Sequence, residues 1–298
     1  MNDSVWQHYL SLCKPKVVAL MLLTAWVGMI LAAPPTQLPW LALSLGTLGI
    51  AFCASSAAVI NHLVERHIDV HMKRTQHRPV ASGKISPSRA FVFSLILGLL
   101  GLGILVTWVN TLTACLTFAT LIGYAMVYTL FLKQATPQNI VIGGLAGAAP
   151  PLLGWTAVTN QIDPFGLILV LIIFTWTPPH FWALAIYRRQ EYQQAGLPML
   201  PVTHGVPYTK LNIVLYTVLL IVTTVLPFAF KMCGLLYLLL STPLNLGFLY
   251  YAVKLYRNGS DQLALKVFGY SILYLMGLFL ALILDHYFSW VIFRTIGT

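Results

Sequence analysis

Nine long apolar runs leave this chain few possible folds. They cover about residues 17–33, 38–60, 89–108, 110–131, 138–158, 164–187, 211–230, 234–253 and 267–291. A helix needs about 20 apolar residues to cross the hydrocarbon of a bilayer, and each run is close to that length. Backbone in lipid must satisfy its own hydrogen bonds, and these runs do not alternate as barrel strands do. The sequence therefore predicts an all-α integral membrane protein with nine transmembrane helices in one bundle.

The Lys and Arg residues predict how the bundle lies in the membrane. If the N-terminus is cytoplasmic, fifteen of the seventeen fall on the cytoplasmic side and only Lys231 and Arg294 fall on the other. The fifteen are Lys14, Lys16, Arg66, Lys73, Arg74, Arg78, Lys84, Arg89, Lys133, Arg188, Arg189, Lys210, Lys254, Arg257 and Lys266. Such a bias is typical of cytoplasmic loops. It accounts for the net charge of +10 without a nucleic-acid partner.

The beginning of the chain predicts where the protein is located. No small-residue cleavage site follows the first apolar run, and the first residues are not rich in Arg. We therefore expect neither a cleaved signal peptide nor a transit peptide. A multi-pass protein of a bacterial inner membrane is the location that fits.

Two connections on the predicted cytoplasmic side are longer than the others, 61–88 and 188–210. Connections longer than about 12–15 residues are usually functional or disordered. We expect these two to cap an active site within one membrane domain that covers residues 1–298.

The first long connection begins with Asn61, Glu65 and Asp69, which are spaced i, i+4, i+8. On a helix these side chains form one stripe. Carboxylates and amide oxygens bind Mg²⁺, and neighbouring cations bind phosphate. The stripe, with Glu191 from the second connection, therefore predicts a site for a Mg²⁺-bound diphosphate. The alternative is that these acids form helix-end ion pairs with Arg66, Arg74 or Arg78.

Four cations near these acids are candidates for gripping the diphosphate: Arg74, Arg78, Lys133 and Arg188. Arg binds phosphate through two N–H groups at once, whereas Lys acts as a point charge. The alternative reading for each is that it only sets the membrane topology.

Two further segments interrupt apolar runs. His180 lies in Thr177-Pro-Pro-His-Phe-Trp182, and an ionisable residue at membrane depth is a functional candidate. A histidine satisfied by backbone groups that Pro178 and Pro179 free is the other reading. The segment 143–155 is rich in Gly, Ala and Pro, which favours close helix packing and also allows it to shape a cavity.

Taken together, several motifs resemble the UbiA-type intramembrane prenyltransferases, and within them the branch that acts on haem. They are Asn61…Glu65…Asp69 with Met72-Lys-Arg-Thr75 and Arg78-Pro79, Tyr128-Thr…Leu-Lys133…Asn139-Ile, Gly143-Gly-Leu-Ala-Gly-Ala-Ala-Pro-Pro, Pro179-His-Phe-Trp-Ala-Leu-Ala-Ile-Tyr-Arg188 and Glu191-Tyr…Ala195-Gly-Leu-Pro-Met-Leu-Pro-Val202. The last two point to the haem branch. The resemblance covers the chain from Lys14 to the ninth apolar run.

The resemblance implies transfer of a farnesyl group from farnesyl diphosphate to the vinyl group of haem B, with addition of water, giving haem O and diphosphate. It also implies Mg²⁺ as cofactor. His62 and His67 stand where the family often has acids, which leaves one or two ions open. His180 is then expected to contact the haem. Haem A synthase or the assembly of a terminal oxidase are the expected protein partners.

Three other functions compete with this reading. The first is a prenyltransferase of the same family that acts on a quinone or chlorophyll precursor. The second is a transporter, whose buried charges should lie near the bilayer midplane. The third is an assembly scaffold without catalysis.

Overall fold

The computed structural model describes residues 4–70, 75–132 and 135–296, and over this part of the chain it is built of helices without strands. Nine helical stretches in these ranges are long and apolar enough to cross a membrane, which confirms the predicted bundle. They are α2 (Pro15–Ala32), α3 (Thr47–Asp69) entered through the π-helical turn η1 (Ala42–Gly46), α4 (Pro87–Ile104) continued by η2 (Leu105–Val109), α5 (Thr111–Ile122) continued by η3 (Gly123–Leu132), the pair α7 (Asn139–Ala148) and α8 (Pro150–Thr159), α9 (Pro164–Tyr187), α12 (Gly205–Ala229), α13 (Leu235–Asn258) and α14 (Asp261–Ile296).

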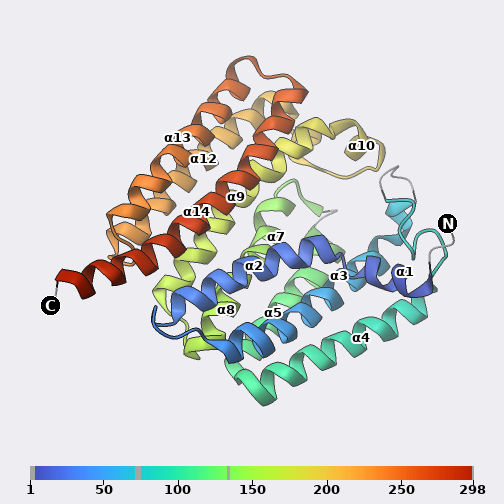
Figure 1. Ribbon diagram of the computed structural model, residues 1–298. Coiled ribbons are helices and arrows are strands. Elements are labelled where there is room, and N and C mark those ends of the chain that lie inside the picture. Colours follow the sequence, from blue (N-terminus) through green and yellow to red (C-terminus); the bar gives the residue numbers. More distant parts are fainter. Residues whose placement is uncertain (1–3, 71–74, 133–134, 297–298) are drawn as a thin grey trace.

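Three short helices complete the described chain: α1 (Val5–Leu12), α10 (Arg189–Gln194) and α11 (Leu200–Thr203). The two termini lie at opposite ends of the bundle (Figure 1), as an odd number of spans requires. In the same view, α10 lies toward the end of the bundle that holds the N-terminus.

The predicted spans are correct in number and order, but the helices run past the apolar runs. The helix α3 continues to Asp69, so the first residues of the predicted connection 61–88 are helical. The predicted connection 188–210 contains α10, α11 and the first turn of α12. Apolar runs mark only what lipid covers. A helix continues beyond them where its polar side chains find partners.

Small residues bring the helices of the first half into direct backbone contact. A Cβ added at Gly154 of α8 would lie 2.0 Å from the carbonyl oxygen of Ala25 in α2, and one at Gly28 equally close to that of Pro151. The helices α3 and α4 approach in the same way, since a Cβ at Gly101 would lie 2.7 Å from Cys53 Sγ. Because lipid removes the hydrophobic drive between helices, such close packing carries much of their association.

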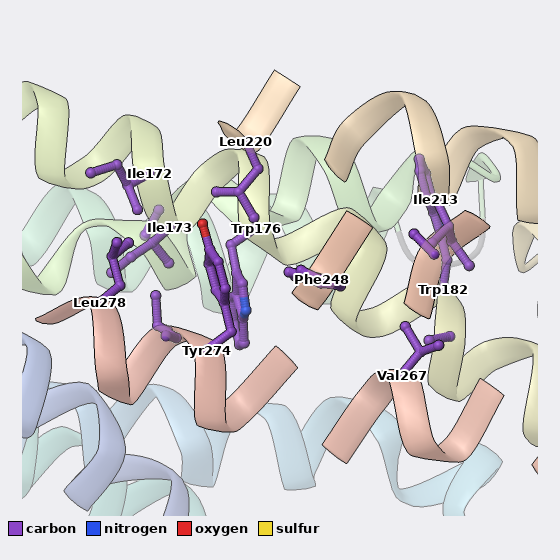
Figure 2. Close-up of a cluster of buried hydrophobic side chains, with 14 of the residues drawn as sticks. Ile172, Ile173, Trp176, Trp182, Ile213, Leu220, Phe248, Val267, Tyr274 and Leu278 are labelled. Atoms are coloured by element: carbon purple, nitrogen blue, oxygen red, sulfur yellow. The ribbon is translucent and has the colours of Figure 1, made fainter. Parts of the chain in front are cut away.

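The second half of the chain packs around large side chains. Figure 2 shows Ile172, Ile173 and Trp176 of α9 against Tyr274 and Leu278 of α14. Trp176 Nε1 donates to the Ser271 carbonyl at 2.8 Å, which holds α9 and α14 in register. The helices α12 and α13 cover the remaining side, where Tyr237 Oη donates to the Thr224 carbonyl at 2.7 Å.

The helix is interrupted between α7 and α8 at Ala149 and Pro150, because the proline has no backbone N–H to donate to a helical hydrogen bond. Beyond the break, α8 packs along α2. Before the break, a cavity separates α7 from α2. The segment 143–155 therefore does both things that its composition allows: it packs closely and it shapes a cavity.

The orientation of the bundle can be measured with reporter fusions at Asp163, which precedes α9, and at Ser260, which precedes α14. The Lys/Arg bias predicts that Asp163 is outside and Ser260 is in the cytoplasm. A reporter that is active only in the cytoplasm should therefore respond at Ser260 alone. Both sites on the same side would contradict nine spans, and a reversed response would contradict the orientation.

Candidate active site

The last two turns of α3 present three oxygen-bearing side chains on one face. Because the helix is continuous to Asp69, the predicted spacing of Asn61, Glu65 and Asp69 holds. These side chains are buried, with exposed fractions of 3%, 5% and 1%. Asn61 Nδ2 donates to Glu65 Oε1 at 2.7 Å and lies 3.5 Å from Thr129 Oγ1 of η3. The stripe is a hydrogen-bonded row inside the protein rather than a solvated helix face.

Arg78 joins the two carboxylates of the stripe. Its Nη1 lies 2.9 and 2.8 Å from the two carboxylate oxygens of Asp69 and 3.3 Å from Glu65 Oε2. Thr75 Oγ1 donates to the backbone carbonyl of Asp69 at 3.1 Å, so Thr75 lies against the end of α3. The ion-pair reading of the acids is therefore observed for Arg78. Arg66 instead donates to the Leu63 carbonyl at 2.8 Å.

Lys14 is a site residue that the sequence analysis missed. It stands between α1 and α2 in the left-handed region, with φ of 49°, and its Nζ donates to Asn61 Oδ1. A non-glycine residue with this backbone conformation is uncommon and often marks a functional position. From the sequence, Lys14 is expected only to be one of the cytoplasmic cations that set the membrane topology. The proline that follows it was a local signal of an unusual junction.

A cavity of about 470 Å³ extends from these polar groups into the bundle. Along α3 its wall passes from Asn61 through Ala57 and Cys53 to Ile50, a distance of about 16 Å at 1.5 Å per residue. Most of its other lining is apolar as well. Val17 of α2 and Phe181 of α9 line it and are 55% and 44% exposed, so the cavity is not fully enclosed.

Three tyrosines surround the polar end of the cavity: Tyr124 and Tyr128 of η3, and Tyr192 of α10. The rings of Tyr124 and Tyr128 stack, with centroids 5.5 Å apart. The side of the cavity formed by α7 is made of small residues, Gly143, Ala146 and Gly147 among them.

The structure does not bring every predicted residue to this cavity. Arg188 and Glu191 are half-buried at the start of α10 and are not part of the lining, whereas their neighbour Tyr192 is. Arg188 Nε and Glu191 Oε2 are buried without a hydrogen-bond partner among the residues that the structure describes. Arg74 and Lys133 lie outside the described residues. For these four the role in diphosphate binding stays a prediction.

His180 is buried on α9 beside the lining residues Trp176 and Thr177, but it is not itself part of the lining. Its Nδ1 lies 2.6 Å from Ser271 Oγ of α14. Its ring stacks on Trp176 and on Phe268, with centroids 4.2 and 4.4 Å away. Its observed partner is therefore a side chain of α14 rather than backbone freed by Pro178 and Pro179. The contact with haem stays a prediction.

The donor set at the polar end fits a hard cation. Within the described ranges no group of three His, Cys, Asp or Glu side chains forms a metal site. The protein offers Asn61, Glu65 and Asp69 instead, an amide and two carboxylates on one face. Mg²⁺ is usually bound by one or two carboxylates together with substrate phosphate oxygens and water. The residues therefore fit an ion that a diphosphate substrate helps to bind.

Comparison with known proteins identifies the class of this fold and site. A profile of the UbiA prenyltransferase family matches residues 21–293. The chain belongs to this family and is a membrane prenyltransferase.

Curated relatives narrow the class. The chain is 61% identical over 282 residues to the protohaem IX farnesyltransferase of Teredinibacter turnerae, covering 95% of this chain and 90% of that one. It is 62% identical over 286 residues to the enzyme of the same name from Legionella pneumophila, covering 95% and 96% of the two chains.

Two solved structures share the fold. A digeranylgeranylglyceryl phosphate synthase superposes with a TM-score of 0.80 at 22% identity, covering 95% of this chain and 99% of that one. A UbiA homolog from Archaeoglobus fulgidus bound to GPP and Mg²⁺ superposes with a TM-score of 0.63 at 18% identity, covering 92% and 99%.

Substitution at Gly147 tests whether substrate occupies the cavity. A Cβ added there meets no atom of the described residues within 4 Å, so we expect the side chain of Gly147→Leu to take up space at the cavity wall. We expect thermal stability close to that of the parent and turnover reduced by about tenfold or more, because pocket volume is lost. Gly103→Leu is the matched control, since Gly103 is equally open but lies outside the lining. Equal activity of the two variants would show that substrate does not use this part of the cavity.

Proposed function

We propose that this protein transfers a farnesyl group from farnesyl diphosphate to the vinyl group of haem B and adds water, giving haem O and diphosphate. The observation that carries the proposal is one continuous cavity whose polar end holds carboxylates and cations and whose remainder is apolar. Such a cavity suits a substrate with a charged head and a hydrocarbon tail.

The charges at the polar end explain why a metal is needed. Among the charged side chains that line the cavity, Lys14 and Arg78 balance Glu65 and Asp69, so these four have a formal net charge of zero. A diphosphate ester carries several negative charges and would be poorly neutralised here on its own. Mg²⁺ held by Asn61, Glu65 and Asp69, with Glu191 from the second connection, supplies the missing positive charge for the leaving oxygens. The Archaeoglobus homolog, whose structure is bound to GPP and Mg²⁺, supports this assignment; one or two ions fit.

Arg78 and Lys14 contribute directly to binding the diphosphate. Both lie at the polar end and line the cavity. The guanidinium N–H groups that now contact Asp69 are the same groups that would bind phosphate oxygens. Arg74, Lys133 and Arg188 are assigned to the same task from the sequence.

The remainder of the cavity separates the reaction from water. The bond between C1 of the farnesyl group and the diphosphate oxygen breaks, and its electron pair leaves with the diphosphate. The allylic cation that remains is attacked by the vinyl group of haem B, and water then captures the new cation and loses a proton. An apolar wall protects the first cation from premature capture by water.

The identity of the acceptor rests on the names of relatives that are about 60% identical along nearly the whole chain. A quinone or chlorophyll precursor is the alternative acceptor within the same family. Transport is disfavoured, because the charged groups of the cavity gather at one end rather than at the midplane. The bacterial inner membrane is the proposed location, and haem A synthase and terminal oxidase assembly are the proposed partners.

A direct assay tests the acceptor. Purified protein in detergent or lipid is incubated with labelled farnesyl diphosphate, Mg²⁺ and either haem B or a quinone precursor. We expect the label to appear in a haem whose mass has increased by one farnesyl group and one hydroxyl group. Label in the quinone alone would establish the alternative acceptor. Label in neither would contradict the proposed function.

The metal site is tested with Asp69→Ala. We expect turnover to fall about a hundredfold or more, because Mg²⁺ loses one of its carboxylate ligands and Arg78 loses its main ion-pair partner. Asp261→Ala is the matched control: Asp261 is a carboxylate that pairs with Arg189 and does not line the cavity. Both proteins are titrated with Mg²⁺ in the same assay. Full activity of Asp69→Ala would rule out the proposed site.

A further inference from the structure

The stacked pair Tyr124–Tyr128 lies between the charged end of the cavity and its apolar part. Both rings line the cavity. They lie beside the stripe, because Asn61 Nδ2 is 3.5 Å from Oγ1 of Thr129, the residue that follows Tyr128. The C1 atom of a bound farnesyl diphosphate must occupy this same level, because it joins the charged head to the hydrocarbon tail.

The pair is held in place from behind. A Cβ added at Gly143 of α7 would lie 2.1 Å from Cδ2 of Tyr128, so the Tyr128 ring rests on the bare backbone of α7. Tyr124 stacks on the Tyr128 ring at an interplanar angle of 27°. The π-helical backbone of η3 contributes, because Thr129 Oγ1 donates to the Tyr124 carbonyl at 2.8 Å, five residues back. π-Helical turns are frequent at functional sites.

Other aromatic rings of the cavity are less suited to face a cation at this level. The Trp176 ring stacks on His180, and its Nε1 is engaged by the Ser271 carbonyl. Phe181 is 44% exposed, so its surroundings exclude water less well. Tyr124 is the ring that combines a supported position with closeness to the carboxylates.

We infer that Tyr124 is a catalytic residue whose π face stabilises the allylic cation, and that Tyr128 is a positioning residue that holds it. In this step the C1–O bond of farnesyl diphosphate breaks and its electron pair goes to the diphosphate oxygen. The positive charge that remains is shared between C1 and C3 of the farnesyl group. The negative face of an aromatic ring attracts such a charge, most strongly where water is excluded. The inference rests on the proposed prenyl-diphosphate chemistry, but it does not depend on which acceptor is used.

The experiment replaces Tyr124 with Phe, with Leu and with phenylalanines that carry increasing numbers of fluorine atoms. Phe keeps the π face, and Leu removes it. Fluorine weakens the π face at nearly constant size. We expect Tyr124→Phe to retain most of kcat and Tyr124→Leu to lose about tenfold, which corresponds to about 1.4 kcal/mol. Along the fluorinated series kcat should fall stepwise, while KM for farnesyl diphosphate stays within about twofold.

A second measurement follows cleavage of the C1–O bond without any acceptor present. Farnesyl diphosphate is labelled with ¹⁸O at the oxygen that joins C1 to phosphorus. When the C1–O bond breaks and re-forms, the label moves to a non-bridging position of the same phosphate. The exchange should slow along the same fluorinated series. Haem O formation by the unsubstituted protein tests the proposed function separately, so failure of that function and failure of this inference give different results.

Tyr250→Leu is the control for loss of a tyrosine ring, since Tyr250 lies on α13 and is 58% exposed outside the cavity. It should leave kcat and label exchange unchanged. Tyr128→Phe should also be mild, because the stacked ring remains. Rates that do not change along the fluorinated series would overturn the inference. So would a loss confined to KM, which would make Tyr124 a binding residue only.

Discussion

Two carboxylates buried at the end of a membrane helix set the conditions for the rest of the site. Glu65 and Asp69 are almost fully enclosed. Burial of an ionised group costs several kcal/mol unless cations and hydrogen bonds compensate it. Arg78 provides that compensation directly, and the Lys14–Asn61–Glu65 chain of hydrogen bonds extends it. The turn at Thr75 and the left-handed backbone at Lys14 therefore follow from the need to pair these charges.

The same constraint explains why the cavity can remain open beneath the charges. Ion pairs and hydrogen bonds at the polar end join α3 to the α1–α2 junction and to the chain after Asp69, and a buried cluster that includes Leu63, Val80 and Ile85 packs beside them. Closer to the other end, Gly28 and Gly154 bring α2 and α8 into backbone contact. The helix interruption at Pro150 separates the part that borders the cavity from the part that is closely packed. The result is a bundle that is tight at one end and hollow at the other, with the polar groups above the hollow.

The sequence was sufficient to predict the spans and the acidic stripe, because both depend on periodicity and on exclusion of water. Lys14 was missed because its role depends on a backbone conformation and on a partner 47 positions away. His180 illustrates the same limit, since Ser271 is 91 positions away. Arg188 and Glu191 follow the end of α9, where no long periodic pattern shows which way a side chain points. In that short helix the structure directs Tyr192 to the cavity instead.

Charge balance at the polar end also couples the two ligands of the proposed site. The four charged side chains sum to zero, so Mg²⁺ alone would add two positive charges, and a diphosphate ester trianion alone would add three negative charges. Bound together they add only one negative charge, so each ligand lowers the electrostatic cost of the other. Such coupling is reciprocal by thermodynamic necessity: the factor by which Mg²⁺ strengthens donor binding equals the factor by which donor strengthens Mg²⁺ binding. A site balanced by Arg78 and Lys14 therefore favours the metal–diphosphate complex over either component. When both ligands are bound, Mg²⁺ is already in place to stabilise the negative charge that leaves with the diphosphate.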